Sequence, residues 1–371
     1  MVLMTDDNRI VVLAGAGLCR DAGLPMSVEL VTRLQDTLNA RSQIAEGGIP
    51  AAKDRDQARR WLALFHFLNG GIRFQEGVLD RDPGAPINIE QIAVAAEELY
   101  ARMSNPLAPY SAGWHPRLEE LEQQDVNLLK SFVDFIYSRL QEWLSIENPQ
   151  TAYYMEGFRD LCIDGHFVDL FTLNYDLCIE TVLSHARTPF VNGFDERGVW
   201  SPASYNLSTE IRLYKLHGSL DWADDEVYGL CSLQFPRHQS AETIQGDDAR
   251  PLLIFGTAHK LSAKEPFLTL AYHFSQQVLT TKILAVIGYS FGDEYINQII
   301  EQGMKRNSNL RVIVVSPSAV ASIRTQPFLD RSPRVIPICE SAEHALTKKA
   351  LRDQIRKVLA DVSSEAPFSD E

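Results

Sequence analysis

The sequence is short of cysteine, and its few cysteines are scattered. No C-x-x-C pair occurs among the five, which are Cys19, Cys162, Cys178, Cys231 and Cys339. This spacing speaks against a zinc ribbon and against a disulfide framework. It is typical of reduced, mostly buried thiols in a cytosolic protein. We therefore expect no metal site and a cytoplasmic location.

Long apolar runs and an excess of positive charge are also missing. The first apolar run, residues 10–13, is far too short for a signal peptide or a membrane span, so we expect no membrane association. The formal net charge is −14, from 35 Lys and Arg against 49 Asp and Glu. Diffuse nucleic-acid binding depends on basic side chains that neutralise phosphates. We therefore expect this chain to meet nucleic acid only through a partner protein.

What the chain does have is a series of short apolar runs that end in small or polar residues. These strand candidates are 9–14, 167–173, 211–216, 252–255, 283–287, 311–315 and 335–338. The first leads through a glycine turn to a helix for which Ser27 is the expected N-cap. In an open α/β sheet, ligands bind at the carboxyl ends of the strands. The ends of these runs are therefore the expected site.

Between the first two strand candidates the apolar period becomes helical. The stripes are Trp61, Leu62, Phe65 and Leu68, then Ile89, Ile92, Ala96 and Leu99, then Leu129, Phe132, Val133, Ile136, Leu140, Trp143 and Leu144. The pattern predicts the α/β class: a Rossmann-like open parallel sheet with a mainly helical insertion after the first βα unit. We expect one domain over 1–371, with a core at about 1–40 and 165–350, an insertion at about 41–164 and an acidic tail at 363–371.

Four strand ends carry residues suited to nucleotide chemistry. Gly15-Ala16-Gly17 is a turn of the kind that brings backbone N–H groups to a diphosphate, although Arg20 departs from the usual dinucleotide fingerprint. Asn174 and Asp176 could hold a ribose hydroxyl and an amide. Each segment alone also fits an ordinary turn.

The other two strand ends are similarly ambiguous when taken singly. His217 precedes Gly218 at a strand end, and histidine side chains change protonation near neutral pH, which suits a general base. A structural histidine is the alternative reading. Gly288-Tyr289-Ser290 leads to Asp293, which could contact a ligand or cap the next helix.

The four segments together, in this order, resemble the sirtuin family. Residues 15–25 resemble its GAGxSxxSGIP signature, with Cys19 and Ala22 at the two serine positions, and 172–176 resembles its TQNID segment. The triplet 217–219 matches the family's HGS, and 288–290 stands where sirtuins have GTS. The longer string GYSFGDxxIN is typical of sirtuin-like proteins of bacterial defence systems. The resemblance leaves out the helical insertion.

The resemblance implies that NAD⁺ is the substrate and that its nicotinamide–ribose bond is cleaved. Asn174 and His217 would be catalytic. The substrate-binding residues would be Gly15, Ala16, Gly17, Cys19, Asp21, Asp176, Gly288, Ser290, Asp293 and Ser316. The four zinc-binding cysteines of sirtuin deacylases are missing, as is usual in the defence proteins that hydrolyse NAD⁺. A protein deacylase and a sensor that binds NAD⁺ or ADP-ribose without turnover remain the alternatives.

Control of such an activity implies partners, because an unregulated NAD⁺ hydrolase would poison its own cell. The resemblance implies a homo-oligomer that is paired with a HerA-type hexameric ATPase, or else with a short Argonaute-type protein. In that setting the chain would be the NAD⁺-depleting effector of anti-phage defence. The helical insertion, which the expected active site does not need, is the expected assembly surface.

Overall fold

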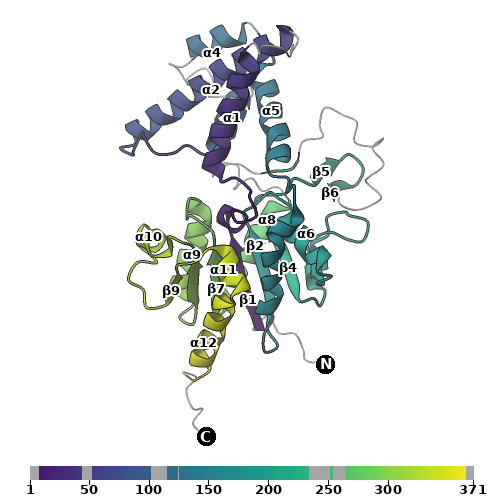
Figure 1. Ribbon diagram of the computed structural model, residues 1–371, viewed down its shortest axis with the longest axis vertical. Helices are drawn as coiled ribbons and strands as arrows, with labels where there is room; N and C mark the ends of the chain where they lie inside the picture. The colour runs from purple at the N-terminus through teal and green to yellow at the C-terminus, as the bar shows by residue number, and fades with distance from the viewer. Residues whose placement is uncertain are drawn as a thin grey trace. The chain divides into compact units, whose positions relative to one another are not determined.

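The computed structural model describes residues 8–43, 52–101, 115–123, 125–233, 251–253 and 265–364 (Figure 1). The chain forms two compact units, one of Met1–Leu24 with Ser145–Glu371 and the other of Pro25–Leu144. The first unit contains the sheet, and the second is helical. Among the described residues, no helix is both long enough and apolar enough to cross a membrane.

A seven-stranded parallel sheet organises the first unit and confirms the predicted α/β class. The strand order is β3-β4-β2-β1-β7-β8-β9, and every pairing is parallel. The strands are β1 Arg9–Ala14, β2 Phe167–Thr172, β3 Phe190–Val191, β4 Ile211–Lys215, β7 Ile283–Ile287, β8 Arg311–Val315 and β9 Val335–Ile338. The chain builds outward from β1 to one edge and then returns to β7. The order therefore reverses between β1 and β7, which is where open α/β sheets bind their ligands.

The strand predictions hold for six of the sheet strands and miss the short ones. β3 is only two residues long, and the antiparallel hairpin of β5 (Trp222–Asp225) and β6 (Gly229–Ser232) has no clear alternation in the sequence. Of the expected strand at 252–255, only 252 and 253 are described. Leu253 pairs with Gly218 in an isolated bridge, and residues 254–257 lie outside the described residues.

Both faces of the sheet are covered by helices, because alternate residues of each buried strand point to opposite sides. Ile10 and Val12 of β1 pack in the layer with η5 (Pro149–Leu161), α6 (Cys178–His185), α11 (Ala342–Thr347) and α12 (Ala350–Ser364). Val11 and Leu13 pack in the layer with α8 (Phe267–Thr280), α9 (Glu294–Arg306) and α10 (Ala319–Arg324). The site is thus carried by a three-layer α/β/α unit.

The second unit confirms the three predicted helical stripes. Its helices are α1 Ser27–Ser42, α2 Ala52–Val78, α3 Ile89–Ala101, α4 His115–Glu122 and α5 Leu128–Trp143. Ser27 is not the N-cap of α1, contrary to the prediction. It is the first helical residue, and the Glu29 side chain satisfies the helix start by accepting a hydrogen bond from Met26 N at 2.8 Å. Residues 365–371 of the predicted tail lie outside the described residues.

The parallel register brings the strand ends to one level. Ala14 of β1 pairs with Thr172 of β2 and with Ile287 of β7. Thr172 pairs in turn with Lys215 of β4, and Ile287 pairs with Val315 of β8. The residues that follow these five positions include all the strand-end motifs. Motifs far apart in sequence therefore start from the same edge of the sheet.

The turns after β1 and β7 touch through their backbones. Gly15 N donates to Ile287 O at 3.0 Å, and Gly17 N donates to Gly288 O at 2.8 Å. Gly288 has a φ of 62°, in the left-handed region, and a Cβ there would lie 2.3 Å from Leu18 N. Only glycine satisfies both the conformation and the contact.

We expect Gly288→Ala to destabilise the protein by more than about 2 kcal/mol, because left-handed strain and a backbone clash combine. The matched control is Gly292→Ala in the same loop, where the nearest atom to a new Cβ is Ser290 Oγ at 3.6 Å. It should change stability by less than about 0.5 kcal/mol. Urea unfolding monitored by circular dichroism measures both, and equal midpoints would contradict the packing argument.

Candidate functional site

Asn174 lies in the β2–α6 loop and faces the glycine turn. The residue is 7% exposed, and Nδ2 donates to Gly15 O at 3.1 Å and to Cys19 Sγ at 3.3 Å. Its own backbone N donates to Thr172 Oγ1 at 3.1 Å. The amide is therefore held in one orientation, with its oxygen free of these contacts. The structure brings Asn174, Gly15 and Cys19 together as a first cluster.

Asp176 joins the same cluster from the start of α6. Its Oδ1 accepts hydrogen bonds from Cys19 Sγ at 3.4 Å and from Cys178 N at 3.0 Å. The thiol contact to Cys178, together with burial and the nearby Asp176 carboxylate, raises the pKa of Cys19 well above its usual range. The Cys19 thiol is thus protonated at neutral pH and can donate to Asp176.

His217 and Asp293 form a second cluster across the β4 and β7 ends. His217 Nε2 lies 3.0 Å from Asp293 Oδ2, and both side chains are 6% exposed. Among the described residues His217 Nδ1 has no hydrogen-bond partner, although it is buried. A carboxylate at Nε2 favours the tautomer with the proton on that nitrogen. Nδ1 is then left as a proton acceptor.

Asp293 caps the next helix, which is one of the two roles that its sequence position left open, and it also contacts His217. Its Oδ1 caps α9 by accepting hydrogen bonds from Tyr295 N at 3.0 Å and Ile296 N at 3.3 Å, while Oδ2 meets His217. The Tyr289 hydroxyl donates to Asp293 O and accepts from Asp293 N, both at 3.0 Å. The loop between β7 and α9 is therefore clamped around the carboxylate.

Two further contacts fix the position of the His217 loop. Leu220 N donates to Tyr175 O at 3.0 Å, and the Tyr175 and His217 ring centroids lie 6.3 Å apart. Gly218 has a φ of 89°, and a Cβ there would meet Leu252 O at 2.1 Å. The Tyr175 contacts tie the loop that carries His217 to the loop that carries Asn174, and Gly218 packs the same loop against Leu252.

A buried ion pair beneath the Asn174 loop escaped the sequence analysis. Lys215 Nζ lies 2.9 Å from Glu180 Oε1 and also donates to the backbone carbonyls of Tyr175 and Asp176. Burial alone would lower the pKa of Lys215, but Glu180, Asp221 and Asp176 outweigh it, so the net shift is upward. The signal available in the sequence was a lysine on a buried strand, two residues before His217.

The remaining predicted residues have local roles in the structure. Asp21 Oδ2 accepts from Glu343 N at 2.9 Å, which places it at the start of α11. Ser316 Oγ accepts from Ser318 N at 3.2 Å in the turn after β8. Ser290 is exposed to solvent. Because Gly15 N and Gly17 N donate to carbonyls of the protein, those two N–H groups are not directed at a ligand here.

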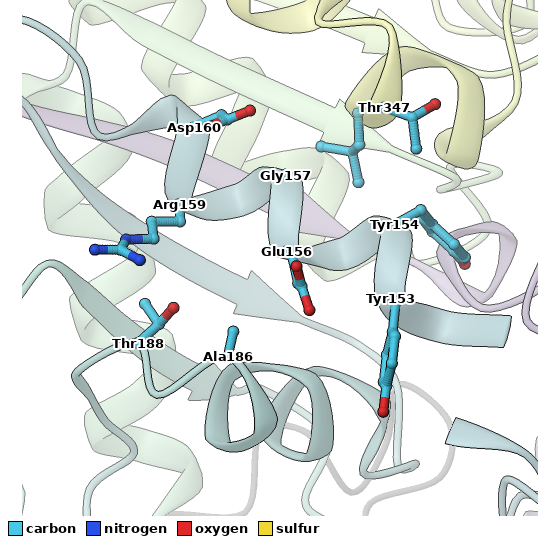
Figure 2. A pocket seen from close by; sticks show the side chains of 10 residues that line it. Tyr153, Tyr154, Glu156, Gly157, Arg159, Asp160, Ala186, Thr188 and Thr347 are labelled. Atoms are coloured by element: carbon cyan, nitrogen blue, oxygen red, sulfur yellow. The ribbon is translucent and has the colours of Figure 1, made fainter. Parts of the chain in front are cut away.

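A separate pocket lies beside η5 (Figure 2). Its volume is about 470 Å³, and Figure 2 shows Glu156, Arg159 and Thr188 around it together with Ala186 and Thr347. Neither Asn174 nor His217 lines it. The pocket is therefore not the candidate site at the strand ends.

Residues 168–335 match the family model of the SIR2-like domain. The match runs from β2 to the start of β9, so it spans less than half of the chain and leaves out β1 and its glycine turn. It includes Asn174, His217, Asp293 and Ser316. None of the curated proteins matches the sequence.

Solved structures of Sir2 proteins also resemble the chain, at low similarity. A Sir2 homologue in complex with NAD aligns with a TM-score of 0.43 and 13% identity, covering 95% of this chain and 90% of that one. A mutant Sir2 homologue in complex with ADP-ribose gives 0.42 and 12%, covering 95% and 93%. Sir2Tm bound to a propionylated peptide gives 0.40 and 9%, covering 94% of each chain. At these values the likeness adds nothing to the fold described above.

Proposed function

We propose that this chain is an NAD⁺ hydrolase that cleaves the nicotinamide–ribose bond at the strand ends beside the β1–β7 reversal. The observation that carries the proposal is the pairing of His217 with Asp293 at 3.0 Å, with a buried Nδ1 that no described residue engages. The SIR2-like match over 168–335 supports the substrate class. The fixed amide of Asn174 on the neighbouring strand end supports it as well.

The chemistry follows from the two clusters. Departure of neutral nicotinamide leaves positive charge on the ribose, which oriented dipoles in a buried site stabilise. Asn174, held by Gly15 O, positions the water or ribose hydroxyl that attacks C1′. His217 Nδ1 accepts the proton as that bond forms, and Asp293 stabilises the resulting imidazolium.

Purified His217→Ala and Asn174→Ala proteins should each lose activity, by about 10²–10⁴-fold for the histidine that acts as the base. The measurement is loss of NAD⁺ and appearance of nicotinamide by liquid chromatography. Thermal melts of both variants show whether the fold is intact. Full activity in folded His217→Ala would contradict the assignment of His217.

The same assay separates hydrolysis from the two alternative functions. A hydrolase releases nicotinamide without an acylated peptide and forms ADP-ribose, whereas a deacylase needs the peptide and forms O-acyl-ADP-ribose. A sensor binds NAD⁺ tightly in calorimetry and yields no product over hours. The buried His217–Asp293 pair favours catalysis, because binding alone has no need of a proton acceptor.

Asp293→Asn tests the carboxylate without removing the helix cap. Asparagine caps helices as well as aspartate does, so the melting temperature should change by only a few degrees. The lost charge at His217 Nε2 should lower kcat by at least about tenfold. Asp293→Ser is the matched control: it retains a capping oxygen but is too short to meet His217, so it should be at least as impaired. Wild-type kcat in Asp293→Asn would refute the role of Asp293.

We further propose that this activity makes the chain the NAD⁺-depleting effector of an anti-phage system, acting in the cytoplasm as a homo-oligomer. The sequence resemblance supports this role and, with it, a HerA-type ATPase as partner. The helical unit supports the assembly part, because large apolar side chains near the end of α2 face solvent. Phe74 is 59% exposed, Val78 66% and Leu79 50%.

Phe74→Asp and Val78→Asp together should reduce the oligomer to smaller species, because charges placed in an apolar interface oppose its burial. Size-exclusion chromatography with light scattering gives the mass. The matched control is Val227→Asp in the β5–β6 turn, which is 79% exposed and belongs to the sheet unit. An unchanged mass in the α2 variant would refute this surface.

A further inference from the structure

Two thiols and a carboxylate converge at the edge of the candidate site. The Sγ atoms of Cys19 and Cys178 and a carboxylate oxygen of Asp176 all lie within 4.8 Å of one another. The three side chains are buried, with Cys19 at 2% and Cys178 at 1% exposure. They come from only two segments, the turn after β1 and the start of α6, and so form a preassembled donor set.

We propose that Cys19, Asp176 and Cys178 form a binding site for a soft divalent metal ion of the Zn²⁺ class. Thiolates and carboxylates bind Zn²⁺ at about 2.0–2.3 Å in a tetrahedron, which sets donor separations at roughly 3.5–3.8 Å. The Cys19 Sγ–Asp176 Oδ1 distance of 3.4 Å already suits that geometry, and the other separations, which are at most 4.8 Å, would shorten on metal binding. Three protein donors leave the fourth position open to water.

Two positive groups lie near the donor set, although the pKa of each thiol is raised in the absence of metal. Cys178 is the first residue of α6, and its thiolate would lie at the positive end of the helix. The Lys215 ammonium lies beneath the loop, on the carbonyls of Tyr175 and Asp176, and balances some of the added negative charge. Without metal, the contact with Cys178 and then burial raise the pKa of Cys19, so metal binding at this thiol releases a proton.

The proposed site is unlike the zinc module of sirtuins. It also departs from the expectation, based on the sequence, that the chain binds no metal. It uses two cysteines rather than four, and it adjoins Asn174, whose Nδ2 contacts Cys19 Sγ at 3.3 Å. A metal ion there would draw Cys19 and Asp176 away from their present contacts. If the proposed function holds, the ion acts as an inhibitor of NAD⁺ cleavage.

The test is a titration of the reduced full-length protein with Cd²⁺, which reports thiolate ligation by an ultraviolet charge-transfer band. We expect one Cd²⁺ per chain, displaced by Zn²⁺. Cys19→Ser and Cys178→Ser should each weaken binding by more than about 100-fold. Loss of a group that only hydrogen-bonds a metal ligand costs about 10–100-fold, so a larger loss indicates direct ligation. Cys231→Ser, buried on β6, and Cys339→Ser, at the exposed cysteine, are the matched controls and should titrate as wild type.

A band that survives in Cys178→Ser, or that vanishes in Cys339→Ser, would overturn the proposal. Should the variants fail to fold, X-ray absorption of Cd²⁺-loaded wild type decides: two sulfur ligands support the site, and none or one refutes it. Inhibition by Zn²⁺ is measured separately as the ratio of rates with and without the metal. The band tests the metal site even if the chain has no NAD⁺ hydrolase activity.

Discussion

The backbone contact between the turns after β1 and β7 is the constraint on which the site depends. Two hydrogen bonds, from Gly15 N to Ile287 O and from Gly17 N to Gly288 O, join these turns directly. No side chain separates them, because a Cβ at Gly288 would collide with Leu18 N. The contact joins the two turns where the strand order reverses, and it fixes the positions of Gly15 O and of the turn that leads to Cys19. Asn174 is then oriented by that same carbonyl.

The polar groups of the site are held by supports that have structural roles of their own. Asp293 is at once a helix cap and the partner of His217, so the start of α9 determines where the imidazole points. Lys215 holds the loop that carries Asn174 in place, because its ammonium binds Glu180 and the backbone carbonyls of that loop. Buried polar networks of this kind are stable only when nearly every member is paired. His217 Nδ1 has no hydrogen-bond partner among the described residues, and it is the atom to which the proposed function assigns proton acceptance.

The glycines of the turn after β1 have a different role in the structure from the one that their sequence motif suggests. The glycine turn after β1 suggests N–H groups aimed at a diphosphate, but two of those groups donate to carbonyls of the β7 end. In this structure Gly15 and Gly17 allow the two strand ends to pack closely, because a Cβ at either position would lie 2.8 Å from Gly288 O. Asp21 also has a structural role that its motif does not suggest. Its carboxylate accepts a hydrogen bond from Glu343 N at the start of α11.

The sequence by itself determined the parallel sheet, the helical insertion and the list of strand-end residues. Hydrophobic period and turn chemistry are local properties, so β1, β7, β8 and β9 could be predicted to the residue. Residues at the ends of parallel strands must also share one edge of the sheet, as the register of Ala14, Thr172 and Lys215 shows. Only the tertiary structure decided which of these residues meet. The pairs His217–Asp293, Lys215–Glu180 and Cys19–Asp176 span 76, 35 and 157 positions of sequence. Such contacts follow from strand order and loop path, which no local pattern encodes.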